Sequence, residues 1–299
     1  MSATQNTGRR SRPRRRPRHV SPASADSFTT GLKALEFLAH NGVKVSARID
    51  DISSGQSLLA VDDYIVMPTA SVGKVLLLID VAAHLQDSSF PALQVLERTA
   101  QDEVAEAGLW QHLQVPALPI SDVAALVAAT SDTVATNVLV RAVGLDSVRR
   151  RTEAIGLRRT AMLDRVRATR GPDDAPHVSL GSMRELSWLF GSLVRGEIVD
   201  QATSGLVTEW LSGNMDLSLV ASAFGMDPLA HRDGRHGLHL INKTGADSSI
   251  RVEAGVLRGP RAGVSYAVAA SFADSDLRSR LAVVDALRTV GEDILEYVV

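Results

Sequence analysis

The sequence of 299 residues contains no cysteine, which excludes thiol catalysis and disulfide bonds but leaves the cellular compartment open. Aromatic residues are scarce, at 4% of the chain. No apolar run reaches the roughly 18 residues that a membrane-spanning helix needs, so we expect no transmembrane segment. The remaining composition, 45% hydrophobic and 22% charged, is that of a globular protein long enough to bury a large core.

Charge is distributed unevenly along the chain. Seven arginines and no acidic residue lie within residues 1–20, so a formal net charge of −2 becomes −9 (−2 minus 7) for the rest. Because this body is acidic, we expect no nucleic-acid binding by the folded part. Residues 1–24 are rich in Arg, Pro and Ser, and we predict a disordered basic tail there, followed by one domain over residues 25–299.

The basic tail does not match a secretory signal, because no apolar segment follows the arginines. The chain as given is therefore expected to be cytoplasmic, with export as the alternative if its start is incomplete.

Hydrophobic periodicity predicts strands near both ends of the chain and helices between them. Strand patterns occur in residues 43–62, 238–245, 249–257 and 264–273, and helical patterns in 26–42 and 276–298. Residues 88–225 have almost entirely helical spacing, interrupted by an irregular loop at 163–179.

This order of elements predicts an α/β protein of the α+β type. We expect an antiparallel sheet made from both chain ends and flanked by the terminal helices. The sheet lobe would comprise residues 25–66 and 228–299, and an inserted all-helical lobe would comprise residues 67–227.

Lysine is rare, since Lys33, Lys44, Lys74 and Lys243 are the only four among 32 basic residues. Arginine keeps its proton in proteins, whereas burial can leave a lysine amine neutral. Lys74 follows Ser71 by three residues at the head of a helix predicted over residues 67–80, where a neutral amine could act as a base for the hydroxyl. We call Ser71–Lys74 the first motif.

Two further segments carry comparable chemistry. The second motif, Ser131-Asp132-Thr133, interrupts a helical segment rich in Ala and Val, although Ser-Asp before a helix is also an ordinary N-cap pattern. The third motif, Lys243-Thr244-Gly245, ends a predicted strand, and its glycine allows a ligand to approach the backbone closely.

Together the three motifs resemble, in order and spacing, the Ser-x-x-Lys, Ser-Asp-Asn and Lys-Thr-Gly motifs of class A β-lactamases and penicillin-binding proteins. Asn137 falls where that family has an asparagine six residues after the second serine, and residues 163–165 (Leu-Asp-Arg) match the start of its Ω-loop. The resemblance runs from about Leu32 to the C-terminus. It implies a β-lactamase/transpeptidase-like fold and a serine hydrolase that needs no cofactor.

The resemblance implies a role for each residue of the site. Ser71 is the nucleophile that attacks a carbonyl, and Lys74 is the base for acylation. The backbone N–H groups of Ser71 and Ala246 form the oxyanion hole. Ser131 passes a proton to the leaving nitrogen, and Lys243 keeps the surroundings of Ser131 positive.

Substrate binding is expected on the third motif. Lys243, Thr244 and Gly245 would hold a substrate carboxylate, with Arg251 on the next strand as a further candidate. Thr133 stands where the family has asparagine. A hydroxyl cannot donate to a substrate carbonyl and accept from a lysine with the reach of an amide, so substrate positioning is expected to differ.

The loop after residues 163–165 departs further from the family, which has an aromatic residue and then a glutamate that activates the deacylating water. Val166 and Arg167 stand there instead, and an arginine cannot act as a general base. Asp173 and Asp174 lie further along the loop and could substitute for the glutamate, but we interpret them as exposed turn residues after Pro172. We therefore expect normal acylation and slow deacylation.

The main interpretation is thus a β-lactamase-like hydrolase acting on β-lactams or related amides and esters. The alternatives are a D,D-peptidase or esterase, and a penicillin-binding sensor that stays acylated. A small-molecule β-lactam or a peptidoglycan-like fragment is the expected partner, and a monomer the expected state. His231, His236 and His239 lie close in sequence without a matching carboxylate or cysteine pattern, so we predict no metal site there.

Overall fold

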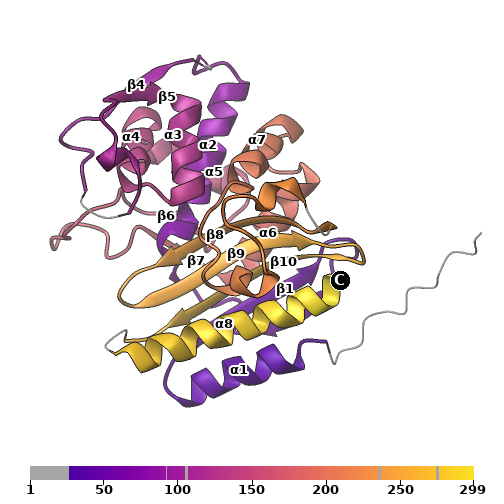
Figure 1. Ribbon diagram of the computed structural model, residues 1–299. Helices are drawn as coiled ribbons and strands as arrows, with labels where there is room; N and C mark the ends of the chain where they lie inside the picture. Colours follow the sequence, from indigo (N-terminus) through magenta and orange to yellow (C-terminus); the bar gives the residue numbers. More distant parts are fainter. Residues whose placement is uncertain (1–26, 92, 105–106, 235–236, 274–275) are drawn as a thin grey trace, which may run out of the picture.

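Five antiparallel strands from both ends of the chain form the central sheet of the computed structural model, in the order β2-β1-β10-β9-β8 (Figure 1). Their bounds are β1 Lys44–Asp51, β2 Ser57–Val61, β8 His239–Ala246, β9 Ile250–Arg258 and β10 Gly263–Ser271. The predicted antiparallel sheet is confirmed. The structure describes residues 27–91, 93–104, 107–234, 237–273 and 276–299, so the predicted tail lies outside the described residues.

The sheet is buried on both faces at its centre, and the sequence of the strands reflects this. In β1, Val45, Ala47 and Ile49 alternate with polar residues and enter the core beneath the terminal helices. In β10, Tyr266 and Val268 enter that same core, whereas Ala267 and Ala269 pack towards the helical lobe. An almost continuous apolar strand is what a position between two covered faces requires.

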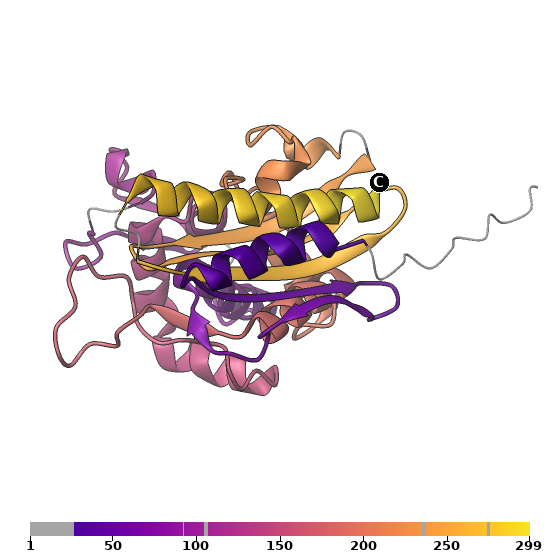
Figure 2. The same ribbon diagram turned by 90° about the horizontal axis from the view of Figure 1, so that it is seen from below.

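Two terminal helices cover one face of the sheet, as predicted. Helices α1 (Thr29–His40) and α8 (Leu277–Val298) lie side by side on one face of the sheet and run roughly along its strands (Figure 2). A Cβ at Gly31 would lie 3.1 Å from the Cα of Val290, so the two helices are in close contact at this point. The Gly31 N–H donates to the Asp293 carboxylate at 2.7 Å. The first N–H groups of a helix have no hydrogen-bond partner within it, so Asp293 supplies one at the N-terminus of α1.

The other face carries the helical lobe. Helix α6 (Met183–Arg195) packs on the sheet, and α2 (Lys74–Gln86) runs through the middle of the lobe. Around α2 lie α3 (Ile120–Thr130), α4 (Thr133–Val143), α5 (Leu145–Ala154) and α7 (Gln201–Leu211). Residues 74–83 of α2 are all buried, which explains why this helix has no polar face. None of the described helices is long and apolar enough to cross a membrane.

Short elements connect these layers. Strands β3 (Met67–Pro68), β6 (Ala161–Met162) and β7 (Ser179–Gly181) form a small sheet, and β4 (Val95–Glu97) pairs with β5 (Ala117–Pro119). The 3-10 turns are η1 (Ala70–Gly73), η2 (Trp110–His112), η3 (Val220–Phe224) and η4 (His231–Asp233).

Two local predictions were wrong. The helix expected over residues 67–80 begins only at Lys74, because β3 and the turn η1 precede it. The described residues between α2 and α3 form β4, β5, η2 and turns rather than helix. Prolines at positions 91, 116 and 119 of this segment remove backbone donors and interrupt any helical continuation.

A buried carboxyl on β9 is the centre of a polar network beside the third motif. One oxygen of Glu253 accepts hydrogen bonds from the Tyr266 hydroxyl (2.7 Å) and the Asn242 amide (2.8 Å), and the other accepts from the backbone N–H of Ala221 (3.3 Å). Burial raises the pKa of Glu253 to about 7, although the hydrogen bonds from Tyr266 and Asn242 act in the opposite direction.

We predict that Glu253→Gln removes part of the pH dependence of stability. Glu253 has a pKa of about 7 in the folded protein, against an ordinary value of 4.5. As pH rises between these two values, the carboxyl of the unfolded chain is ionised while that of the folded protein still holds its proton. The free energy of unfolding therefore decreases over this range. Glutamine keeps an acceptor for Tyr266 and cannot ionise. The decrease in Tm from pH 5 to pH 7 should therefore be several degrees smaller than in wild type, since about 1 kcal/mol shifts Tm by about 2–4 °C in a protein of this size.

The control is Glu36→Gln, at an exposed position on α1. Thermal melts should show the wild-type pH dependence for this variant. Equal pH dependence in Glu253→Gln and wild type would contradict the prediction.

Candidate active site

The turn η1 presents Ser71 between β3 and α2, and two neighbouring segments fix its shape. Ala70 has φ +42°, a left-handed conformation that costs a non-glycine residue about 1–2 kcal/mol. The Ser179 hydroxyl of β7 donates to the Ala70 carbonyl (2.7 Å) and lies 2.7 Å from the Thr69 hydroxyl. A Cβ at Gly73 would lie 2.2 Å from Cβ of Ser179, so only glycine lets β7 approach the turn this closely.

The buried amine of Lys74 joins the first motif to the second. Lys74 is 1% exposed, and its Nζ donates to the backbone carbonyl of Ser131 (2.6 Å) and approaches the Ser131 hydroxyl (3.3 Å). Ser131 lies in the predicted break between α3 and α4, with φ +58°. The left-handed backbone at this position ends α3 and turns the chain towards Lys74.

The rest of the second motif stabilises this break. The buried Asp132 carboxylate caps α4 through the N–H of Ala135 (2.8 Å) and also accepts from the N–H groups of Leu109 (2.7 Å) and Trp110 (2.8 Å). The Thr133 hydroxyl donates to the Ala107 carbonyl at 2.8 Å. Thr133 therefore uses its only hydroxyl proton on the backbone.

Strand β8 brings the third motif against η1. A Cβ at Gly245 would lie 2.5 Å from the Thr69 carbonyl oxygen and 3.0 Å from the Ser71 nitrogen, so glycine permits this contact. Lys243 is fully buried, and its Nζ donates to the Thr244 carbonyl (3.1 Å). Burial lowers the pKa of Lys243 to about 8, although the nearby carboxylates of Asp216 and Glu253 raise it.

Arg251 lies opposite Ala246 in the pairing of β8 with β9, but its guanidinium is directed elsewhere. The guanidinium lies 5.7 Å from the centre of the Phe272 ring and donates to the carbonyls of Asp247 and Ile250. Its expected role in substrate binding stays a prediction.

Asn137 holds the loop that follows residues 163–165. Its side chain accepts from the Val166 N–H (2.9 Å) and donates to the Val166 carbonyl (3.0 Å) and the Asp102 carbonyl (3.3 Å). Both Asn137 and Val166 are buried. The loop backbone is thus attached to α4 next to the first and second motifs.

The charged side chains of this loop are paired with one another. Arg167 bonds the carboxylates of Asp164 (2.7 Å) and Asp174 (3.1 Å), and Arg170 donates to Asp164 (2.8 Å). Burial raises the pKa of Asp164, but the hydrogen bonds from both arginines outweigh it and hold that pKa below its usual value. Asp174 thus forms part of an ion pair, whereas Asp173 is exposed.

One pocket of about 160 Å³ brings most of these segments together. It is lined by Ser71 and Lys74 of the first motif, Thr133 of the second, Ala246 after the third, and several loop residues: Val166, Arg167, Arg170, Pro176, His177 and Val178. This small pocket combines a hydroxyl, a buried amine and two candidate oxyanion donors. These are the groups that nucleophilic attack on a carbonyl uses.

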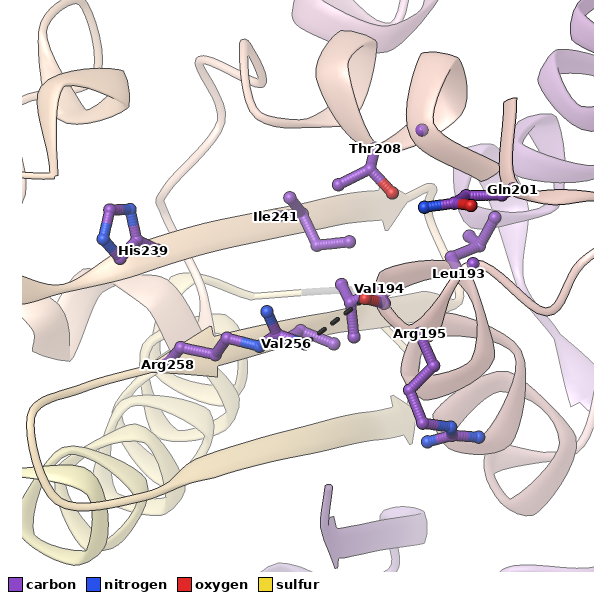
Figure 3. A pocket seen from close by; sticks show the side chains of 11 residues that line it. Leu193, Val194, Arg195, Gln201, Thr208, His239, Ile241, Val256 and Arg258 are labelled. Atoms are coloured by element: carbon purple, nitrogen blue, oxygen red, sulfur yellow. Dashed lines mark hydrogen bonds between the residues drawn. The ribbon is translucent and has the colours of Figure 1, made fainter. Parts of the chain in front are cut away.

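A second pocket, of about 380 Å³, lies at the far end of β8 (Figure 3). Its lining includes Arg195 of α6, Gln201 and Thr208 of α7, and His239 and Ile241 of β8. No residue of the three motifs lines it. His231 lies in η4, and His236 is outside the described residues.

Comparison with known proteins shows the family to which the chain belongs. The model of a family described as the Beta-lactamase enzyme family (Beta-lactamase2) matches residues 27–298. The chain belongs to this family. No curated protein matches the sequence.

Solved structures of the β-lactamase fold resemble the chain over most of its length. A β-lactamase from Sphaerobacter thermophilus has a TM-score of 0.78 at 19% identity, covering 90% of this chain and 96% of the other. A β-lactamase from Xanthomonas campestris has a TM-score of 0.76 at 17% identity, covering 92% and 100%. A mutant of PBP-A, described as an acyl-enzyme complex with penicillin G, has a TM-score of 0.73 at 19% identity, covering 89% and 95%. The expected β-lactamase/transpeptidase-like fold is confirmed.

We predict that Asn137→Ala destabilises the β-lactamase domain and releases its loop. The substitution leaves the buried N–H and carbonyl of Val166 without partners, which costs about 1–3 kcal/mol. Denaturant unfolding should show this loss, and trypsin should cleave faster after Arg165, Arg167 or Arg170. Asn41→Ala, at an exposed helix end, is the matched control. Unchanged cleavage at the loop arginines would contradict the role given to Asn137.

Proposed function

We propose that the protein is a serine hydrolase of the class A β-lactamase type, acting through an acyl-serine on β-lactams or related amides and esters. The observation that supports it best is the position of Lys74, a buried amine in contact with Ser131 and three residues after Ser71, on a pocket shared with Ala246. The PBP-A mutant described as an acyl-enzyme complex with penicillin G supports acyl-serine chemistry in this fold.

Acylation would begin when the Ser71 hydroxyl attacks the carbonyl carbon while neutral Lys74 accepts its proton. The Lys74 amine is buried and contacts Ser131. The backbone N–H groups of Ser71 and Ala246 would stabilise the oxygen of the tetrahedral intermediate. When the carbon–nitrogen bond breaks, the Ser131 hydroxyl would give its proton to the leaving nitrogen and regain one from Lys74, with Lys243 nearby.

The substrate would lie along β8 and be positioned by Lys243, Thr244, Gly245 and Thr133. Because the Thr133 hydroxyl already donates to a backbone carbonyl, it offers a substrate only its lone pairs. Arg251 would reach the substrate only after leaving the Phe272 ring.

Deacylation would be slow because the loop supplies no free carboxylate beside the pocket. Val166 and Arg167 line the pocket where a general base would be required. The carboxylates of Asp164 and Asp174 are bonded to arginines, so their oxygens are already occupied. This observation favours a second candidate, a penicillin-binding protein that remains acylated; a D,D-peptidase or esterase would use the same site.

We predict that excess benzylpenicillin adds the mass of one drug molecule to the protein and that the adduct persists. Ser71→Ala should remain unmodified in the same intact-mass time course, because it lacks the attacking hydroxyl. Ser89→Ala, at an exposed position after α2, should react like wild type.

The drug concentration in the same tube separates the candidates. A persistent adduct with little drug consumed supports slow deacylation. Rapid consumption that depends on Ser71 would show an efficient β-lactamase and contradict the interpretation of the loop. Absence of both adduct and consumption would exclude benzylpenicillin as a substrate.

We predict that Lys74→Arg decreases the acylation rate by about 10²–10⁴-fold, the usual contribution of a positioned general base. Arginine keeps the positive charge but cannot accept the proton. The rate is measured from the growth of the adduct mass, and the thermal melt checks folding. Lys33→Arg, on the exposed side of α1, should leave the rate unchanged. A wild-type rate in Lys74→Arg would exclude Lys74 as the base.

A further inference from the structure

An acidic residue on the loop after α7 occupies the hydroxyl expected to bind the substrate carboxylate. One carboxylate oxygen of Asp216 accepts the Thr244 hydroxyl at 2.6 Å. The other accepts the hydroxyl (2.6 Å) and the N–H (3.1 Å) of Ser218. The backbone of Asp216 is held as well, because its carbonyl accepts from Asn214 at 3.0 Å. Asp216 is therefore fixed in place rather than oriented at random.

In the proposed function the Thr244 hydroxyl binds the substrate carboxylate. Thr244 lies one residue before Gly245, which contacts the Ser71 turn, and two residues before Ala246, which lines the pocket that holds Ser71. A threonine hydroxyl has one proton, and Thr244 gives it to Asp216. A substrate carboxylate at Thr244 would therefore find no hydroxyl proton to accept. It would face the lone pairs of the Thr244 oxygen and the negative charge of Asp216.

The other two groups expected to bind a carboxylate are also engaged. The Lys243 amine is fully buried, donates to the Thr244 carbonyl and lies near the carboxyl groups of Asp216 and Glu253. The Arg251 guanidinium lies over Phe272.

On the opposite wall of the pocket, Arg167 and Arg170 are paired with Asp164 and Asp174. Asp247 adds a further acidic group to the lining. Beside Thr244, the negative charge of Asp216 thus favours ligand groups that are neutral or positively charged.

We propose that Asp216 makes the protein selective for acyl donors that carry no carboxylate beside the scissile bond, namely neutral or cationic esters and amides. This inference rests on the proposed function, since it concerns the substrate of the same serine. Thr244 can then accept a hydrogen bond only from an N–H or O–H group of the acyl donor, and Asp216 attracts a positive group instead of a carboxylate.

The test compares two acyl donors that differ in this one charge, benzylpenicillin and its methyl ester. Acylation rates are measured by intact mass for wild type and for Asp216→Asn, which keeps an acceptor for Thr244 and removes the charge. The quantity of interest is the ratio of the ester rate to the acid rate. Comparing that ratio between variants cancels the intrinsic reactivity of the two donors.

We expect the ester to react at least about 10-fold faster than the acid in wild type, and Asp216→Asn to reduce this ratio about 10-fold by accelerating the acid. Asp285→Asn removes the same charge from an exposed position on α8, on the far face of the sheet, and should keep the wild-type ratio. An unchanged ratio in Asp216→Asn, or a wild type that prefers the acid, would overturn the proposal.

A salt titration of wild type tests the same repulsion without a substitution. Raising NaCl from 0.02 to 0.5 M, concentrations chosen to span a wide range of screening, should accelerate the acid and leave the ester unchanged. Equal salt dependence for the two donors would also overturn the proposal.

A neutral fluorophosphonate distinguishes failure of this inference from failure of the proposed function. If the probe labels Ser71 while the ratio and the salt dependence show no charge preference, only the selectivity is wrong. If neither the probe nor either donor modifies Ser71, the proposed function fails, and the selectivity proposal fails with it.

Discussion

The geometry of the site depends on the close approach of the edge strand β8 to the turn that carries Ser71. A side chain at position 245 would collide with the Thr69 carbonyl, so glycine alone allows this contact. Gly73 plays the same part on the other side of the turn, where β7 approaches through Ser179. The turn is therefore held between two strands, and α2 leaves it in a fixed direction that carries Lys74 to Ser131. Removing either glycine would move all three motifs relative to one another.

The sheet and the terminal helices could be predicted from the sequence because each has a regular apolar pattern over many residues. The start of α2 could not, since β3 and η1 are short and lead directly into the helix. The segment between α2 and α3 was also mispredicted, because its short strands are stabilised by pairing with each other rather than by periodicity. The pairing of Lys74 with Ser131 was accessible only through the motif resemblance, since 57 residues separate them.

Contacts made by polar side chains were the least predictable part of the site. Nothing local in the sequence connects Asp216 with Thr244, 28 residues later, or directs Arg251 to the Phe272 ring. The hydroxyl of Thr133 could be identified as shorter than an amide, but not its bond to the Ala107 carbonyl. Such contacts depend on how loops from different parts of the chain meet. In the proposed selectivity these contacts decide which ligand charges the site tolerates, although they leave the fold unchanged.

The contact between Asn137 and the loop involves only the main chain of Val166. Main-chain atoms are the same for every residue type except proline, so this attachment does not constrain which side chain stands at that position. The path of the loop past Ser71 is therefore maintained by α4, independently of the side chains that the loop presents to the pocket. In this structure, the attachment of the loop and the chemistry of its side chains are separable.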